Sequence, residues 1–357
     1  MEIFVLYALI SSLFWAIFTF VAKYLIQNRM KNYISFALLQ GIIVIILFPI
    51  FSYIIKPNEV FLPPLEIVPY ALISGGTSIL GYLLLYYGLT KYDASSATPL
   101  VGTQSIFIVP LTYIFLGEYY GLIAILWILI AMIGGILTTW DEKIKINELL
   151  SPKNKALWFF LFVAFLYAIG NVTVKPAVKI VSNFNFLIWR EFAWFGVLLI
   201  LMPFIFHKRE QDVLREGWKS TIIPMVLATS ILYFMYISFF YALSVSVQIT
   251  GGLAAATGLF AVIIGFLISK TKAGITLEKH SNRIYLIRFI GALPVSLILY
   301  KFLFNGFNVF MSFKLNLLAI LLPLLLNIIT PVLKGYFFSC ILAPLYLCSP
   351  FDLLCAL

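Results

Sequence analysis

The chain has 357 residues, of which 63% are hydrophobic and 11% are charged, and its formal net charge is +10 at pH 7. A soluble domain of this length needs a larger share of charged residues to cover its surface, so the composition excludes a soluble globular protein. Apolar runs of about 20 residues, each long enough to cross a bilayer as a helix, recur along the chain. The excess of Lys and Arg therefore indicates cytoplasmic loops and does not indicate nucleic-acid binding.

The hydropathy pattern predicts ten membrane spans, because backbone groups in lipid must be paired within the segment and long apolar runs therefore form helices. The first span begins with MEIFVLYALISS, which lacks the basic start of a cleaved signal peptide and is expected to be retained. The spans lie near residues 3–26, 33–55, 66–89, 95–116, 120–140, 156–178, 185–206, 220–242, 248–269 and 285–304.

The two halves of this pattern resemble each other, which indicates an internal repeat of five spans. Since five is an odd number, the second copy would enter the membrane from the opposite face, as in the inverted repeats of secondary transporters. The matches keep the same order and occur at offsets of 152 to 157 residues: Lys23 with Lys175, Pro49 with Pro203, Tyr87 to Leu89 with Tyr241 to Leu243, and Gly134 with Gly291.

A family resemblance starts from the stretch YYGLTKYDASSATPLVGTQSIFIVPLTYIFLGE, residues 86–118. An aromatic-Gly-Leu closes one span, a tight turn leads into small residues, Pro110 lies mid-span and Gly117-Glu118 ends the stretch. This pattern resembles the EamA-type domain of the drug/metabolite transporter superfamily. The segment FFYALSVSVQITGGLAAATGLFAVIIGFLISK looks like a second copy, with Ile264 in place of the mid-span proline.

The resemblance covers roughly residues 1–304 and implies an all-α integral membrane protein with ten transmembrane helices arranged as two inverted five-helix repeats. The expected divisions are a first EamA-like repeat over 1–140, a charged linker over 141–155 and a second repeat over 156–304. A hydrophobic C-terminal extension, 305–357, is long enough for one or two extra helices and holds Cys340, Cys348 and Cys355, whose spacing matches no metal motif.

Charged side chains inside spans are costly and are functional candidates by default. Lys23 and Lys175 lie near span ends, where the alternative is that their ammonium groups reach the membrane surface. Arg190 is followed by Glu191, so the alternative for this arginine is a structural ion pair. Arg288 lies close to a loop and is expected at the interface.

Polar and aromatic residues in the spans complete the predicted solute site, and most aromatic side chains have packing as the alternative. The expected substrate-binding residues are Trp15, Lys23, Gln40, Tyr82, Tyr86, Gln104, Tyr167, Asn171, Lys175, Arg190 and Tyr236. Small residues allow membrane helices to approach closely and to slide. The expected helix-packing and gating residues are Pro110, Gly251, Gly252 and Gly258.

The function predicted from this sequence is transport of a small organic solute, amino-acid-like or drug-like, across the cell membrane by alternating access. The resemblance implies export, and the alternative is a membrane enzyme or lipid-handling protein on a related helical frame. No catalytic residue, metal site or cofactor is expected, because the spans lack a Ser–His pair, paired carboxylates and a phosphate-binding loop. The expected partners are the solute and the lipid bilayer, and a coupling proton or ion stays open.

The distribution of positive charge predicts the orientation. Lys and Arg concentrate in the loops after the odd-numbered spans, whereas the opposite face carries Lys56, Lys179 and Lys301. This bias places the 141–155 linker in the cytoplasm. The resemblance implies the reverse, because family members are generally drawn with both ends of the ten-span core inside.

Overall fold

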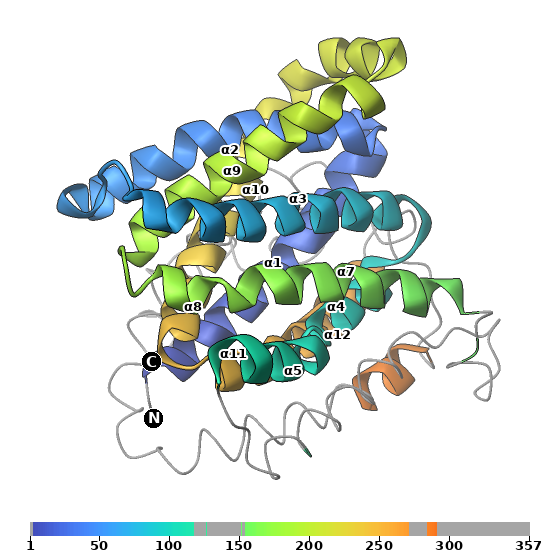
Figure 1. Ribbon diagram of the computed structural model, residues 1–357. Helices are drawn as coiled ribbons and strands as arrows, with labels where there is room; N and C mark the ends of the chain where they lie inside the picture. The colour runs from blue at the N-terminus through green and yellow to red at the C-terminus, as the bar shows by residue number, and fades with distance from the viewer. Residues whose placement is uncertain (1–2, 118–125, 127–150, 152–153, 271–283, 291–357) are drawn as a thin grey trace, which may run out of the picture.

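The structure, a computed structural model, describes residues 3–117, 126, 151, 154–270 and 284–290. Throughout these residues the secondary structure is helical, without a strand, and eight helices are long and apolar enough to cross a membrane. The protein is therefore an all-helical, multi-pass membrane protein, as the composition predicts (Figure 1).

The helices follow the predicted spans closely. In the first half they are α1 (Ile3–Leu25) with the π-helical turn η1 (Ile26–Met30), α2 (Tyr33–Ile55), the short turns η2 (Pro57–Glu59) and η3 (Leu65–Ile67), α3 (Val68–Lys91), α4 (Ala94–Gly102) and α5 (Ser105–Leu116). In the second half they are α7 (Lys155–Val172), α8 (Val174–Ala177), α9 (Asn183–Ile205), α10 (Lys208–Val245), α11 (Val247–Ala254) and α12 (Ala256–Ser269).

Polar side chains fix where several helices begin. The Asn32 side-chain oxygen accepts from the backbone nitrogens of Ile34 (2.8 Å) and Ser35 (3.0 Å), which places the first turn of α2. Ser182 and Ser246 cap α9 and α11 in the same way. These caps satisfy backbone N–H groups that have no partner within the helix, so the chain can turn sharply between successive spans.

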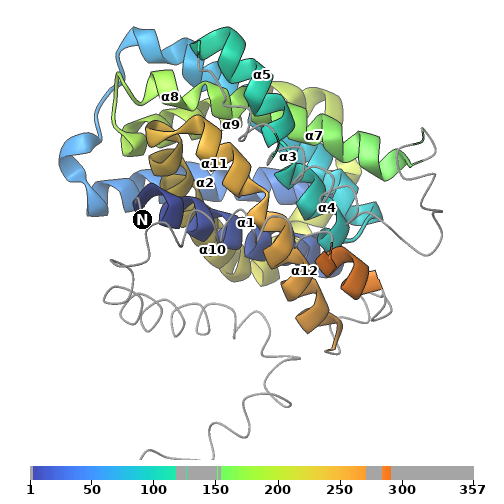
Figure 2. The ribbon, with the colours of Figure 1, turned by 90° about the horizontal axis from the view of Figure 1, so that it is seen from below.

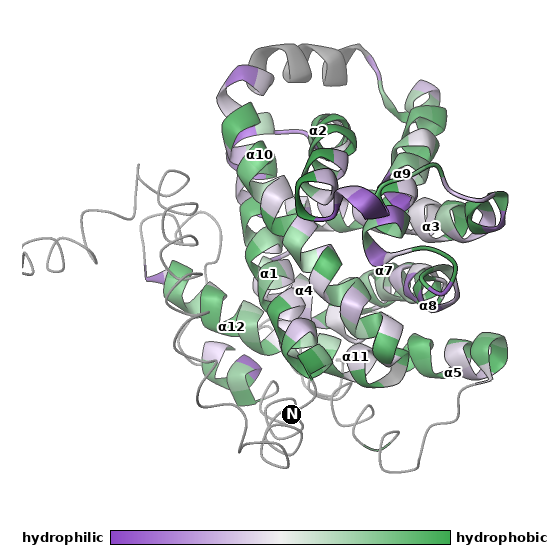
Figure 3. Cartoon of the chain, turned by 90° about the vertical axis from the view of Figure 1, so that its left-hand side faces the viewer, coloured by the Kyte–Doolittle hydropathy of each residue, from purple (hydrophilic) through white to green (hydrophobic). Residues whose placement is uncertain are grey.

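The helices pack as interleaved pairs from the two halves of the chain. α1 lies along α10, α3 lies between α7 and α9, and α4 and α5 lie against α12 and α11 respectively (Figures 1 and 2). One large core of buried apolar side chains joins these helices. The outer helix surfaces are also apolar, for example at Ile200, Phe204 and Ile223, as expected of surfaces that contact lipid (Figure 3).

Two of the ten predicted spans fall largely outside the described residues. The span expected at 120–140 is described at residue 126 alone, and the span expected at 285–304 is described as a helix over residues 284–290. The extension 305–357 also lies outside the described residues. Eight spans are therefore confirmed by length and composition, while the ten-span count, the inverted repeat and the domain divisions stay predictions.

The orientation can be tested at the start of α7, which follows the charged linker. Lys155 is exposed, whereas its neighbour Asn154 is buried and caps α7. In a chain with its three tail cysteines replaced by serine, we expect Lys155→Cys to escape an impermeant thiol reagent in intact cells and to react after permeabilisation. The charge bias predicts this result because it places the linker inside.

Asn58→Cys is the matched control. Asn58 is exposed in the turn η2. The span α3 lies between this turn and the start of α4, so the two are on opposite faces of the membrane. We expect this variant to react in intact cells. The opposite pattern, with Lys155→Cys labelled from outside and Asn58→Cys protected, would establish the family's usual orientation instead.

Candidate functional site

The fourth span is interrupted in its middle. α4 ends at Gly102 and α5 begins at Ser105, with Thr103 and Gln104 between them. The Thr103 hydroxyl donates to the Leu100 carbonyl at 2.6 Å, a local bond that competes with regular helix, and Gly102 is a poor helix former. Pro110 lies further along, on the exposed side of α5, so the interruption falls before the proline and not at it.

The ninth span is interrupted at an equivalent position. α11 ends at Ala254 and α12 begins at Ala256, and the Ala255 nitrogen donates to the Gly252 carbonyl at 3.3 Å. Thr103 and Ala255 are 152 positions apart, the same offset as Lys23 and Lys175.

The two interruptions lie against each other. A methyl group added at Gly102 would lie 3.2 Å from the Ala254 carbonyl oxygen, so the backbones approach closely at the crossing. Gly251 is in contact with Ile108 of α5, and Gly258 with Pro99 of α4. Small residues thus allow the two broken spans to cross at close range, as the sequence predicts for Gly251 and Gly258.

Gly252 differs from the other expected packing residues. Apart from its chain neighbours and the nearby backbone of its own helix, no described atom lies within 4 Å of the position that its Cβ would occupy. The close packing predicted for this cluster of glycines therefore involves Gly251 and Gly258 on one side of α11 and α12, and Gly102 opposite them.

A cavity of about 50 Å³ lies at the crossing. Its wall includes Ser11 and Ser12 of α1, Ala254 of α11 and Thr257 of α12. Six of the residues predicted from the sequence also line it: Trp15, Gln104, Tyr167, Asn171, Arg190 and Tyr236. Most of these side chains are buried, so the cavity lies within the helical core, with polar groups set in a largely apolar wall.

Arg190 of α9 is the charged residue in this wall, and it is 2% exposed. Its Nε donates to the Ser74 hydroxyl at 3.1 Å, its Nη1 to the Glu191 carboxylate, and its Nη2 to the hydroxyls of Ser78 at 2.6 Å and Tyr236 at 3.3 Å. The guanidinium carbon also lies 4.3 Å from the centre of the Tyr236 ring, which favours a cation through the ring quadrupole.

Glu191, the next residue on α9, forms an ion pair with Arg190 and neutralises its charge. This pair is the structural alternative that the sequence suggests for this arginine. Both side chains are buried, and a buried charge without a partner would be strongly unfavourable. The pair holds the guanidinium in a fixed orientation with one N–H of Nη1 left over, since the five donors of arginine make four bonds among the described residues.

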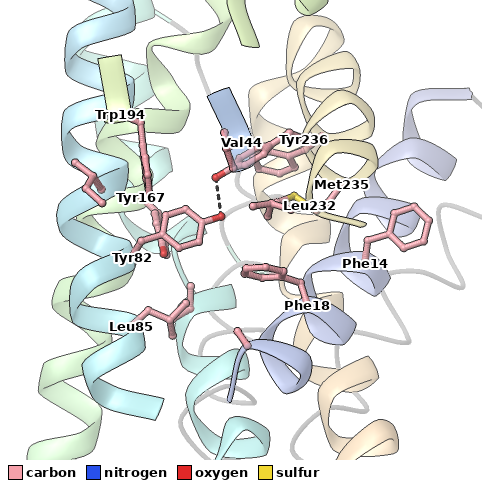
Figure 4. Packing of buried hydrophobic residues seen from close by; sticks show 14 of the residues in the cluster. Phe14, Phe18, Val44, Tyr82, Leu85, Tyr167, Trp194, Leu232, Met235 and Tyr236 are labelled. Carbon is pink, nitrogen blue, oxygen red and sulfur yellow. Dashed lines mark hydrogen bonds between the residues drawn. The ribbon is translucent and has the colours of Figure 1, made fainter. Parts of the chain in front are cut away.

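Aromatic side chains from four helices lie in and around the cavity wall. The Trp15 ring lies 5.7 Å from the Tyr82 ring and 5.8 Å from the Tyr167 ring, in both cases edge to face. The hydroxyls of Tyr82 and Tyr236 are hydrogen-bonded at 2.7 Å (Figure 4). Tyr82 is outside the cavity wall, but it bonds to Tyr236, which accepts from Arg190. Tyr82 thus connects α3 to Arg190.

Asn171 connects α7 to the interruption of the fourth span, because its side-chain nitrogen donates to the Gln104 oxygen at 2.8 Å. Tyr167 lies one turn earlier on α7, on the same face of the helix. Its hydroxyl is buried and has no hydrogen-bond partner among the described residues.

Five predicted substrate-binding residues lie outside the cavity wall. Besides Tyr82, Tyr86 donates a hydrogen bond to Gln40, and both of these side chains are buried. Lys175 is half-buried in α8.

The fifth, Lys23, forms an ion pair of 3.1 Å with Asp93, the residue before α4. The Lys23 side chain is 3% exposed, while Asp93 in the turn between α3 and α4 is 32% exposed, so the ammonium group is covered by protein at that end of the helices.

Arg288 requires a correction. The sequence places it at the interface because it lies near a loop, but it is 1% exposed and donates through Nη1 to the Ser95 hydroxyl in α4. The start of α4 therefore receives two buried cations, Lys23 beside Asp93 and Arg288 at Ser95. The sequence could not identify either contact, because each joins residues that are far apart in the chain.

The fold defines a multi-pass membrane protein with a small cavity among its helices. Residues 2–140 match the EamA-like transporter family. The uncharacterized protein MJ1333.1 of Methanocaldococcus jannaschii is 33% identical over 139 residues, which are 38% of this chain and 96% of that protein. The chain belongs to the EamA-like transporter family and is, in general terms, a transporter.

The fold likeness extends beyond the part matched by sequence. A solved structure titled "Crystal structure of protein" superposes with a TM-score of 0.56 at 11% identity, over 85% of this chain and 99% of that chain. At this identity the likeness shows the fold alone.

Packing at the crossing can be tested with two glycines of the ninth span. We expect Gly258→Ala to destabilise the protein by about 1–3 kcal/mol, because the new methyl group would lie 3.0 Å from Cβ of Pro99, whose ring cannot rotate away. Gly252→Ala is the control and should be neutral or stabilising by up to about 1 kcal/mol, since its position is open and alanine favours helix. Thermal unfolding of both variants in detergent checks this, and equal unfolding temperatures would contradict the packing described here.

The buried ion pair predicts a second stability difference. Glu191→Gln leaves the Arg190 charge without a carboxylate, which should cost about 3–5 kcal/mol and lower the unfolding temperature clearly. Glu59→Gln removes the partner of Lys56 in an exposed pair of 3.5 Å and should cost less than about 1 kcal/mol. A Glu191→Gln variant as stable as Glu59→Gln would show that Arg190 does not depend on this carboxylate.

Proposed function

We propose that the protein is a secondary transporter that moves a small organic metabolite across the cell membrane by alternating access, in the direction of export. The observation that carries the proposal is the crossing of two interrupted spans at a buried polar cavity. In secondary transporters, interrupted helices meet at the substrate site near the bilayer midplane, where their unpaired ends and side chains contact the solute.

The proposed inverted repeat explains why both interruptions exist. If each half contributes one interrupted span, the two breaks are related by the repeat and must lie together at its axis. Their separation of 152 positions supports this, as does the match of MJ1333.1, which spans 139 residues and is thus about as long as one proposed half, 1–140.

The packing on either side of the cavity supports two proposed gates. Towards the start of α4, Lys23 pairs with Asp93; Lys23 lies eight residues beyond Trp15, or about 12 Å along the helix. On the other side, the start of α1 packs against the end of α10 and the interruption of the ninth span, through Phe4, Val5, Ala8, Ala242, Leu253, Ala255 and Ala256. Opening one of these layers while the other stays closed would expose the cavity to one face at a time.

Access to the cavity from both faces is the direct test. Thr257 lines the cavity and is 3% exposed. In a chain with its tail cysteines replaced, we expect Thr257→Cys to react with a small impermeant thiol reagent both in right-side-out and in inside-out vesicles. A cysteine at Ala228, which is buried in α10 and outside the cavity wall, is the control and should react in neither.

Reaction from a single face would contradict alternating access and favour a site that opens to one side, as in a membrane enzyme or lipid-handling protein. Solute flux in liposomes separates these classes further. A transported solute is recovered unchanged on the other side, whereas an enzyme returns a modified product.

A further inference from the structure

The connection between α2 and α3 changes character along its length. Its first part is polar, because Lys56 and Glu59 form an ion pair of 3.5 Å and Asn58 between them is exposed. Its second part, residues 60–67, has the sequence VFLPPLEI and carries one charged residue, Glu66. This second part is called the apolar segment below.

Two leucines of the apolar segment have no protein cover among the described residues. Leu62 is 83% exposed and Leu65 is 87% exposed, the highest values for large apolar side chains in the part of the chain that the structure describes. In water, both would lose the favourable free energy of removing an apolar side chain from solvent. The ends of α2 and α3 continue the same apolar surface, through the exposed side chains of Tyr53, Ile54, Ile55, Leu72 and Ile73. The apolar segment therefore extends a surface that faces lipid.

Hydrogen bonds to α9 show where the apolar segment lies relative to the spans. The Phe61 carbonyl accepts from Asn185 Nδ2 at 3.1 Å and from Trp189 Nε1 at 3.2 Å. α9 begins at Asn183, so Trp189 lies six residues, or about 9 Å, beyond the start of the helix. Phe61 is thus beside the first two turns of α9 and not beyond its end.

The backbone of the apolar segment is suited to a place with little water. Pro63 and Pro64 have no N–H group, and the Ile67 nitrogen donates to the Pro64 carbonyl at 3.1 Å. The Phe61 carbonyl already has two donors. These features reduce the number of backbone groups that need water as a partner, which is the main obstacle to placing a connection in lipid.

We propose that the apolar segment is a membrane-binding element. Leu62 and Leu65 insert into the lipid bilayer beside the outer ends of α2 and α3, and the Phe61 carbonyl attaches the segment to α9. The partner is the bilayer itself, at the depth where the acyl chains begin. Trp189 directly precedes Arg190 of the cavity wall, so the segment helps to hold the helix that carries this arginine at a fixed depth.

The test measures collision rates of nitroxide labels on single cysteines in the full chain, with the tail cysteines replaced by serine and the protein in liposomes. Leu62→Cys and Leu65→Cys report on the segment, Asn58→Cys on its polar neighbour and Leu72→Cys on a lipid-facing position of α3. Oxygen concentrates in lipid, whereas a polar nickel chelate stays in water. We expect the oxygen-to-nickel ratio at both leucine positions to exceed that at Asn58 about tenfold or more and to match that at Leu72, because lipid excludes polar solutes.

The ratio separates lipid from the other possible surroundings of the leucines. A ratio at Leu62 and Leu65 equal to that at Asn58 would place the apolar segment in water and overturn the proposal. Low collision rates with both reagents would also overturn it, since the leucines would then be covered by protein, either another part of the chain or a second copy. All four positions are exposed, so these substitutions should not disturb folding.

The attachment to α9 is tested with the label at Leu62. Asn185→Leu combined with Trp189→Phe removes both donors to the Phe61 carbonyl and keeps side chains of similar shape. The label should become more mobile and its oxygen-to-nickel ratio should fall about twofold or more, because the segment then exchanges between lipid and water. Trp189→Phe alone should give a smaller fall, which keeps the test open if the double variant does not fold.

Trp158→Phe is the matched control for the loss of an indole donor. Trp158 is also exposed, and its Nε1 donates to the Ser151 carbonyl at 3.2 Å at the start of α7. This variant should change neither the mobility nor the ratio at Leu62. If the Trp189→Phe variants behave like Trp158→Phe, the hydrogen bonds to Phe61 do not hold the segment and its attachment to α9 is overturned.

Discussion

The structure depends on one constraint, which is that a backbone N–H or C=O inside a bilayer must find a partner within the protein. Uninterrupted helices such as α2 and α3 meet it by themselves and can face lipid over much of their length. The fourth and ninth spans meet it with shorter bonds at their breaks, because Gln104 donates to Val101 and Ala255 donates to Gly252. These breaks lie inside the protein, where they cross each other at Gly102 and Ala254 beside the cavity.

The same need for partners applies to the charged side chains that are buried in the core. Arg190, Lys23 and Arg288 are each buried, and each is bonded to a side chain of another helix or to an adjacent carboxylate. Such pairs contribute little net stability compared with apolar residues of similar size, because removing the charges from water costs about as much as their attraction returns. Under the proposed function, Arg190 would line the solute site and Lys23 would belong to a gate, which would explain why these charges are kept in the membrane.

The features that the sequence predicts well depend on hydropathy and on which residues are neighbours in the chain. The eight confirmed spans follow from apolar length, and the Arg190–Glu191 pair follows from adjacency in the chain. Six of the eleven predicted binding residues line one cavity, because intramembrane polar and aromatic side chains tend to face the interior of a helical bundle.

The remaining features arise from contacts between distant segments. Pro110 is the obvious candidate for a break in the fourth span, but the break falls at Thr103 and Gln104, where the ninth span crosses. Lys23 is placed by Asp93, 70 positions away, and Arg288 by Ser95, 193 positions away. Periodicity and spacing carry no information about such pairs, so a single sequence cannot assign these side chains to a cavity, a gate or a surface.

The central claim is that the two interruptions form a site which opens to water during a transport cycle. Hydrogen–deuterium exchange of the native chain in lipid nanodiscs tests it most directly, because exchange reports opening of individual backbone segments. The account predicts faster exchange in peptides covering residues 101–106 and 253–258 than in the uninterrupted middle of α3, residues 75–82. Exchange in both interrupted segments as slow as in α3 would contradict it, because the breaks would then be sealed structural features.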